Sequence, residues 1–124
     1  MDADWNQRFA GIDRLYGRGA VERFAACHVA VVGLGGVGSW VAEALARSGV
    51  GTLTLIDADD LCVSNTNRQL PALAGQYGRP KVTAMGERCR AINPSMVVHE
   101  VPRSLSPSNL AELLDRGYDL VVDA

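Results

Sequence analysis

The stretch that decides the fold is Gly33-Leu34-Gly35-Gly36-Val37-Gly38. It directly follows His28–Val32, a short β-branched run typical of a strand buried on both faces. A helix is predicted from about Val37 to Ser48, because apolar residues recur there at spacings of three and four. These residues are Val37, Trp40, Val41, Ala44 and Leu45. A GxGxxG turn between a strand and a helix brings phosphate to the free N–H groups of the helix, so a nucleotide site is predicted.

Strands and helices are predicted to alternate on the C-terminal side of this turn. The further strands are Thr52–Ile56, Met96–Val101 and Leu120–Val122. The further helices are Pro80–Ile92 and Ser106–Asp115, the second capped by Ser106. The first of these helices is expected to bury Val82, Met85, Cys89 and Ile92. This order favours an α/β fold, a Rossmann-like parallel sheet with flanking helices, truncated after about four strands. Short N-terminal helices precede it, broken near Gly17 and Gly19. We expect residues 1–27 to form a helical segment and residues 28–124 an incomplete nucleotide-binding domain.

The composition narrows the class of protein. The chain has 124 residues, of which 48% are hydrophobic and 21% charged, and a net charge of -2. These values exclude a disordered chain and a global electrostatic attraction to nucleic acid or membrane. No apolar run approaches the ~20 residues of a membrane helix, and no signal peptide is recognisable, so a cytoplasmic protein is expected. Three cysteines without a CxxC pair are expected to be small buried hydrophobes.

The loop after the second strand distinguishes an ATP-using enzyme from a nicotinamide oxidoreductase. Asp57 lies where a ribose-binding acid is expected, and residues 57–69 are unusually rich in Asp, Asn and Arg. Arg68 beside Asn amides, with Lys81 as a second cation, suits the negative charge of a triphosphate. An ATP-using enzyme is therefore favoured over a nicotinamide oxidoreductase. A non-catalytic interaction domain, with Arg68 and Lys81 as solvated surface charges, is the further alternative.

Several motifs together resemble the adenylating domain of the ubiquitin-activating-enzyme-like superfamily, which includes the ThiF, MoeB and HesA proteins. They are Gly33–Gly38, Asp57-Ala58-Asp59, Ser64-Asn65-Thr66-Asn67-Arg68-Gln69, Gly78-Arg79-Pro80-Lys81, Asn93-Pro94 and Val121-Val122-Asp123. Three local features also resemble the branch of tRNA threonylcarbamoyladenosine dehydratases. These features are Gln7-Arg8-Phe9 followed by Arg14-Leu15-Tyr16-Gly17, Gly36-Val37-Gly38-Ser39-Trp40, and Asn65-Thr66-Asn67-Arg68-Gln69.

The resemblance implies ATP and Mg²⁺ as cofactors and a role for each matching residue. The nucleotide loop would comprise Gly33, Gly35, Gly36 and Gly38. Asp57 would bind the ribose, with Asp59 in the same loop. Asn65, Arg68 and Lys81 would bind phosphate and carry catalysis, and Asp123 would bind magnesium.

The implied reaction activates the threonyl carboxylate of threonylcarbamoyladenosine in tRNA and closes it to the cyclic form. This is ligase- or cyclase-type chemistry, with modified tRNA as the partner and a homodimer as the assembly. The alternative is an adenylyltransferase that activates a ubiquitin-like sulfur carrier for thiamin or molybdopterin synthesis, which leaves a sulfur-transfer protein open as a partner. Arg8 matches the first arginine of a superfamily motif that acts across subunits. We expect residues 1–124 alone to be inactive.

Overall fold

The computed structural model describes residues 4–124, which form four strands and five α-helices. In chain order these are α1 (Trp5–Tyr16), α2 (Ala20–Ala25), β1 (His28–Val32), α3 (Gly38–Arg47), β2 (Thr52–Ile56), α4 (Lys81–Ile92), β3 (Val97–Val101), α5 (Leu110–Leu114) and β4 (Leu120–Asp123). A short 3₁₀ turn, η1 (Val63–Asn65), interrupts the long loop between β2 and α4. The predicted strands β1 and β2 have the bounds expected from the sequence.

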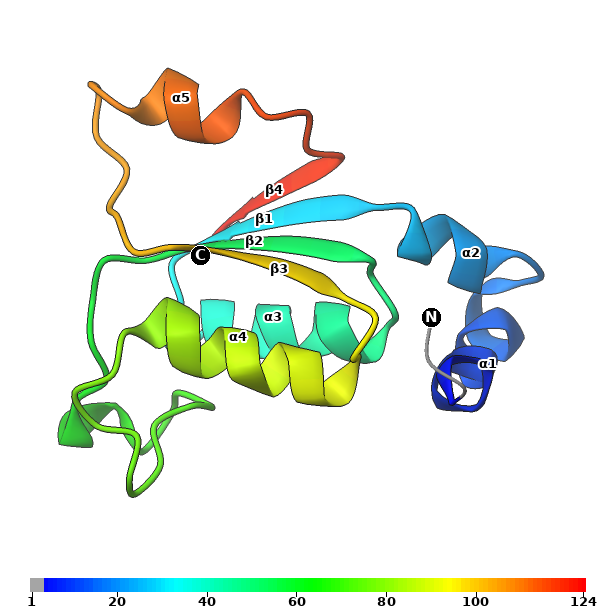
Figure 1. The fold of residues 1–124 in the computed structure, drawn as a ribbon, viewed down its shortest axis with the longest axis horizontal. Helices are drawn as coiled ribbons and strands as arrows, with labels where there is room; N and C mark the ends of the chain where they lie inside the picture. The colour runs from blue at the N-terminus through cyan, green and yellow to red at the C-terminus, as the bar shows by residue number, and fades with distance from the viewer. Residues whose placement is uncertain (1–3) are drawn as a thin grey trace.

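The four strands form one parallel sheet in the order β3-β2-β1-β4. Figure 1 shows α3 and α4 on one face of the sheet, α5 on the other, and α1 and α2 beyond one end of the strands. The strand order reverses between β1 and β4, and ligands of such sheets bind at the carboxyl ends of the strands where this reversal occurs. The predicted Rossmann-like architecture is therefore confirmed.

The main core lies between the sheet and the two helices α3 and α4. Alternate strand residues supply one side of it, and the other side comes from the buried faces of the helices. Its members include Val29, Val31, Leu53, Leu55, Ala42, Ala46, Val82, Met85 and Cys89. The predicted buried face of α4 is confirmed, with Ile92 partly buried at its end.

The apolar residues whose spacing predicts α3 are not its most buried residues. Val37 and Trp40 are 66% and 55% exposed, whereas Ser39, Ala42 and Ala46 are fully buried. Small side chains let α3 approach the sheet and α4 closely, and hydrophobic spacing alone does not reveal that requirement. The larger apolar residues of this helix consequently face outward or lie at the edge of the core.

The predicted start of the last helix is wrong. The α5 helix begins at Leu110, with Asn109 as its N-cap residue and no side-chain cap. The amide of Asn109 instead accepts a hydrogen bond from the backbone N–H of Ser106 at 2.8 Å and donates one to the carbonyl of Ser104 at 2.9 Å. These bonds hold residues 104–109 in a turn, which delays the helix.

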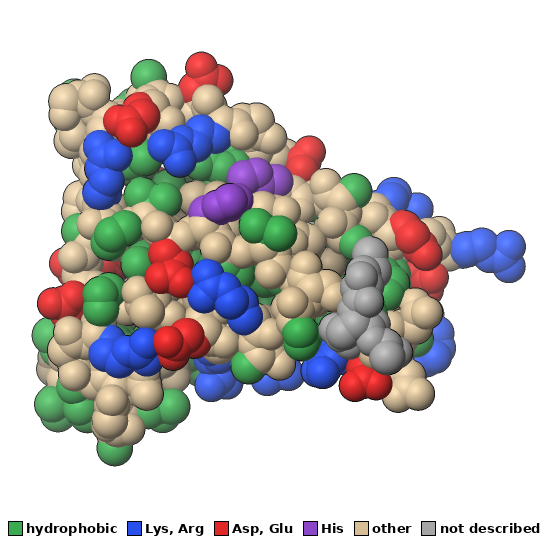
Figure 2. Space-filling model, in the orientation of Figure 1, with side chains coloured by type: hydrophobic (Ala, Val, Ile, Leu, Met, Phe, Trp, Pro, Cys, Tyr) green, Lys and Arg blue, Asp and Glu red, His purple; other side chains and the backbone are tan. Residues whose placement is uncertain are grey.

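The face of the sheet that carries α5 is partly polar. His28 Nε2 lies 2.7 Å from Thr54 Oγ1, and the rings of His28 and His99 are 5.8 Å apart. Figure 2 shows the histidine side chains together, with acidic and basic side chains interspersed around them.

The N-terminal helices have a small core of their own. Trp5, Phe9 and Val21 form it, and Asp13 Oδ1 accepts a hydrogen bond from the backbone N–H of Val21 at 2.9 Å. The boundary expected at residue 27 stays a prediction. Within residues 4–124, no helix combines the length and apolarity that a bilayer crossing requires.

Candidate functional site

The glycine loop between β1 and α3 is shaped by close backbone approaches. Gly33 has a φ of +93°, a region that favours glycine, and its N–H donates to the carbonyl of Ile56 at 2.8 Å. A Cβ on Gly38 would overlap the carbonyl oxygen of Gly33 and lie 2.7 Å from its carbonyl carbon. The strand and helix therefore meet more closely than any side chain permits, which is the packing role predicted for the last glycine of the motif.

Asp57 ties this loop to the end of β2. One carboxylate oxygen accepts the N–H of Leu34 at 2.7 Å, and the other accepts the N–H of Asp59 at 2.8 Å. Each oxygen retains acceptor capacity, since a carboxylate oxygen has two lone pairs. A crevice of about 190 Å³ opens beside Asp57, lined by Val32, Gly33, Ile56, Asp57, Ala58, Asp59, Arg103, Ser104 and Leu105.

Arg68 lies directly over the glycine loop. A Cβ on Gly36 would approach Arg68 Cγ and Cδ at 3.2 and 3.3 Å, so the absence of a side chain there gives the arginine its path. The guanidinium donates from one terminal nitrogen to the carbonyl of Ser64 and to Asn67 Oδ1. The indole N–H of Trp40 holds the carbonyl of Arg68 at 3.0 Å. A cation is thus positioned beside the predicted phosphate loop.

Two further polar residues connect the loop after β2 to the glycine turn. Ser39 Oγ donates to the carbonyl of Gly35 at 2.6 Å and accepts the N–H of Leu70 at 3.4 Å. Gln69 is 6% exposed, and its Oε1 has no hydrogen-bond partner within the described residues. Both residues lie within motifs quoted above, but the sequence predicts no role for them. Their surroundings are formed by segments far apart in the chain, and such contacts leave no local sequence pattern.

Asn65 is engaged within its own turn. Its Oδ1 accepts the N–H of Cys62 at 2.9 Å, and its carbonyl accepts the N–H groups of Arg68 and Gln69. The side chain therefore shapes the segment that presents Arg68. Its amide nitrogen, a donor, is not used in this contact.

Lys81 is a buried cation at the first residue of α4. It is 6% exposed, and its ammonium has no hydrogen bond or ion pair within residues 4–124. Its backbone N–H donates to the carbonyl of Asp59 at 3.0 Å, which places the start of α4 beside the loop that carries Asp57. An uncompensated buried cation is costly, and such groups cluster where ligands of opposite charge bind.

Asp123 ends β4 beside the glycine loop. It pairs in register with Val32, the residue before Gly33, and it is exposed. A cluster of three or more His, Cys, Asp or Glu side chains suited to a metal is absent from residues 4–124. One carboxylate is nevertheless enough for Mg²⁺, which is commonly held by one or two carboxylates together with substrate phosphates.

The structure thus gathers most predicted site residues at the carboxyl ends of the strands. Contacts link the glycine loop to Asp57, Arg68 and Asp123, and Asp59 to Lys81. The structure adds Arg103, which lines the crevice and pairs with Glu112 at 3.1 Å.

The cysteines differ in their surroundings. The prediction of a buried hydrophobe holds for Cys89, whose burial raises the pKa of its thiol to about 12. It is wrong for Cys62, which is exposed in the polar loop before η1.

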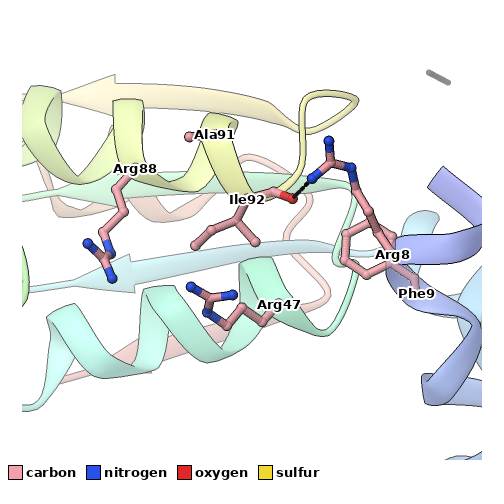
Figure 3. A pocket seen from close by; sticks show the side chains of 6 residues that line it. All are labelled: Arg8, Phe9, Arg47, Arg88, Ala91 and Ile92. Atoms are coloured by element: carbon pink, nitrogen blue, oxygen red, sulfur yellow. Dashed lines mark hydrogen bonds between the residues drawn. The ribbon is translucent and has the colours of Figure 1, made fainter. Parts of the chain in front are cut away.

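A larger cavity, of about 440 Å³, lies away from this site. It is lined by Arg8, Phe9, Arg47, Arg88, Ala91 and Ile92, from α1 and the C-terminal parts of α3 and α4 (Figure 3). The predicted nucleotide site instead adjoins the smaller crevice, which Gly33 and Asp57 line.

Known proteins resemble this chain over nearly its whole length. A tRNA threonylcarbamoyladenosine dehydratase of Haemophilus influenzae is 53% identical over 98% of this chain and 46% of that protein. The E. coli tRNA N6-threonylcarbamoyladenosine dehydratase in complex with ATP superimposes with a TM-score of 0.96 at 52% identity, over 99% of this chain and 51% of that one. A sulfur carrier protein adenylyltransferase of Thermus thermophilus is 40% identical over 83% of this chain and 38% of its own length.

The chain spans about half the length of the dehydratases that it matches. The model of the ThiF family matches residues 8–124, which include most of α1, the other helices, the glycine loop and all four strands. The chain therefore belongs to the ThiF family.

Proposed function

We propose that this chain is the nucleotide-binding part of an ATP-dependent tRNA threonylcarbamoyladenosine dehydratase. The observation that carries the proposal is the phosphate loop crossed by Arg68, in a chain 53% identical to a dehydratase of that name. We further propose modified tRNA as its partner, a homodimer as its assembly and the cytoplasm as its compartment.

ATP fits the crevice and the loops around it. The glycine loop and the N-terminus of α3 bind the phosphates through backbone N–H groups, beside the side chain of Arg68 that passes over Gly36. The remaining lone pairs of Asp57 accept ribose hydroxyls. Arg68 and Lys81 neutralise the phosphate charge, with the amide of Asn65 as a further donor, and Asp59 lies at the rim.

A magnesium ion would fit the end of β4, where Asp123 would offer one hard oxygen ligand beside the glycine loop, as Mg²⁺ is commonly held by one or two carboxylates together with substrate phosphates. The ion, when bound, neutralises charge that develops on the phosphates during transfer.

The chemistry begins with a carboxylate, which is a poor electrophile because of its negative charge. Transfer of an adenylyl or phosphoryl group from ATP to a carboxylate oxygen creates a leaving group. The substrate's own carbamoyl group then attacks the carbonyl carbon, and the leaving group carries the oxygen away. The protein supplies positioning and neutralisation, and no cysteine nucleophile is needed.

The alternative substrate, a ubiquitin-like sulfur carrier, would use the same ATP residues. The sequence favours the dehydratase, because identity to the dehydratase is 53% and identity to the sulfur carrier adenylyltransferase is 40%. The two activities differ in the molecule that carries the carboxylate, so an assay that supplies both substrates separates them.

The test incubates the intact protein with ATP, Mg²⁺ and tRNA that carries threonylcarbamoyladenosine. Mass spectrometry of the digested nucleosides should reveal loss of one water from the modified adenosine. Replacing Arg68 by alanine should abolish this product, while Arg116→Gln, a change in the segment that follows α5, should not. Exchange of pyrophosphate that depends on a sulfur carrier, with no response to the tRNA, would contradict the proposal.

A further inference from the structure

The cavity between α1, α3 and α4 presents arginines from three separate helices. Figure 3 shows Arg47 and Arg88 directed into the space between α3 and α4, with Arg8 at its far end. Arg8 donates to the carbonyl of Ile92 at 3.4 Å, which anchors its guanidinium at the mouth of the cavity. None of the described residues that line this space is acidic. The cavity therefore has the chemistry of an anion site.

Glu43 of α3 orients Arg47 and Arg88 through hydrogen bonds. It is 8% exposed and accepts hydrogen bonds from Arg88 Nε at 2.6 Å and from Arg47 Nε at 2.8 Å. Its hydrogen bond with Arg88, more than any other contact, lowers the pKa of the Glu43 carboxyl, which keeps it charged. Arg88 also donates from one terminal nitrogen to Glu43 at 3.2 Å, so Glu43 holds Arg88 by two bonds. Arg47 is held through Nε alone, and its terminal nitrogens have no partner within residues 4–124. Guanidinium groups held in this way bind phosphate without a large loss of side-chain freedom.

The position of the cavity indicates what kind of anion it takes. The α4 helix connects it to Lys81, and twelve residues of α-helix place its two ends about 16 Å apart. None of the residues that line this cavity lines the crevice beside Asp57, so the two spaces are separate. A polynucleotide that offers one nucleotide to the crevice does extend over this distance, and its backbone carries the negative charge that arginines recognise.

We propose that Arg8, Arg47 and Arg88 form a binding site for backbone phosphate of the RNA substrate. The identity of the polyanion as tRNA rests on the proposed function. The site supplies affinity and orientation without reading bases, and within this chain it shares no lining residue with the crevice beside Asp57.

The test measures binding of the intact protein to an unmodified tRNA transcript and to the same tRNA carrying threonylcarbamoyladenosine, over a series of salt concentrations. Arg47→Gln removes one charge at a side chain that is 61% exposed, so the fold should persist. Arg47→Lys retains the charge. Arg116→Gln is the matched control, because Arg116 also pairs with a glutamate four residues earlier and is 43% exposed.

Arg47→Gln should weaken binding of both RNAs about tenfold, the effect of losing one charged hydrogen bond. It should also reduce the slope of log affinity against log salt by about 0.7 to 0.9, as for one lost phosphate contact. Arg47→Lys should retain the slope, and Arg116→Gln should match the wild type. Equal affinities and slopes for wild type and Arg47→Gln, or no tRNA binding by the wild type, would overturn the proposal. Failure of the proposed function is distinguishable, since tRNA binding would then persist without any cyclic product.

Discussion

Replacing Gly38 by alanine tests the close approach on which the nucleotide loop depends. The added Cβ would lie 2.7 Å from the carbonyl carbon of Gly33, whereas carbon atoms in good contact are about 3.5 Å apart. The overlap with the carbonyl carbon is about 0.8 Å, and the overlap with the carbonyl oxygen of Gly33 is larger. Both contacts are with backbone atoms, so no side-chain rotation relieves them. Such overpacking typically costs about 1–3 kcal/mol.

Helix propensity acts in the opposite direction. Alanine is favoured over glycine within a helix by about 1 kcal/mol, and Gly38 is the first residue of α3. Steric overlap exceeds this gain, so we expect a net loss of about 1–2 kcal/mol in the free energy of unfolding. That loss corresponds to a decrease in Tm of roughly 4–8 °C for a chain of this size. ATP affinity should also fall, because the loop must move.

Urea unfolding followed by circular dichroism measures this change as a lower midpoint at an unchanged m-value. Gly11→Ala is the matched control, because Gly11 lies exposed within α1 and its added Cβ would come only within 3.6 Å of Arg14. Gly11→Ala should be neutral or stabilising. If Gly38→Ala were as stable as Gly11→Ala, the packing argument for the last glycine would be refuted.

Three further changes probe the site and the core around it. Gly36→Ala should displace only the flexible side chain of Arg68, so calorimetry should detect weaker ATP binding at unchanged Tm; a shift of Tm without a change in affinity would contradict this. Lys81→Met removes a buried cation that has no partner within residues 4–124, so the free energy of unfolding should rise by about 1 kcal/mol. ATP turnover should be lost, and retained turnover would exclude Lys81 from the reaction. Glu43 has its pKa lowered in the folded state by its hydrogen bond with Arg88, so it stabilises the fold above the ordinary pKa of 4.5, and this stability is lost as pH falls through the folded pKa. Glu43→Gln should therefore show a shallower decline of Tm in acid than the wild type, and identical declines would refute this linkage.

Local sequence patterns predict the bounds of those strands and helices that have strong start and stop residues at both ends. The strands His28–Val32 and Thr52–Ile56 were predicted with correct bounds, because β-branched runs there are bounded by glycine or by acidic loops. The α4 helix was predicted to within one residue, since Pro80 and Asn93-Pro94 mark its limits. The last helix lacked such a limit at its start, and hydrogen bonds from Asn109 decided where it begins.

Residue type and spacing predict the kind of site: a glycine turn after a strand, an acid at the end of the next strand, and cations in the loop that follows. These properties depend on residue type and spacing, which are local. Only the tertiary structure decided which face of α3 is buried, that Arg68 crosses Gly36, that Lys81 lies buried without a partner, and that three distant arginines share one cavity. Each of these depends on how closely separate elements approach in space, and that distance is set by packing across the whole sheet rather than by any one segment.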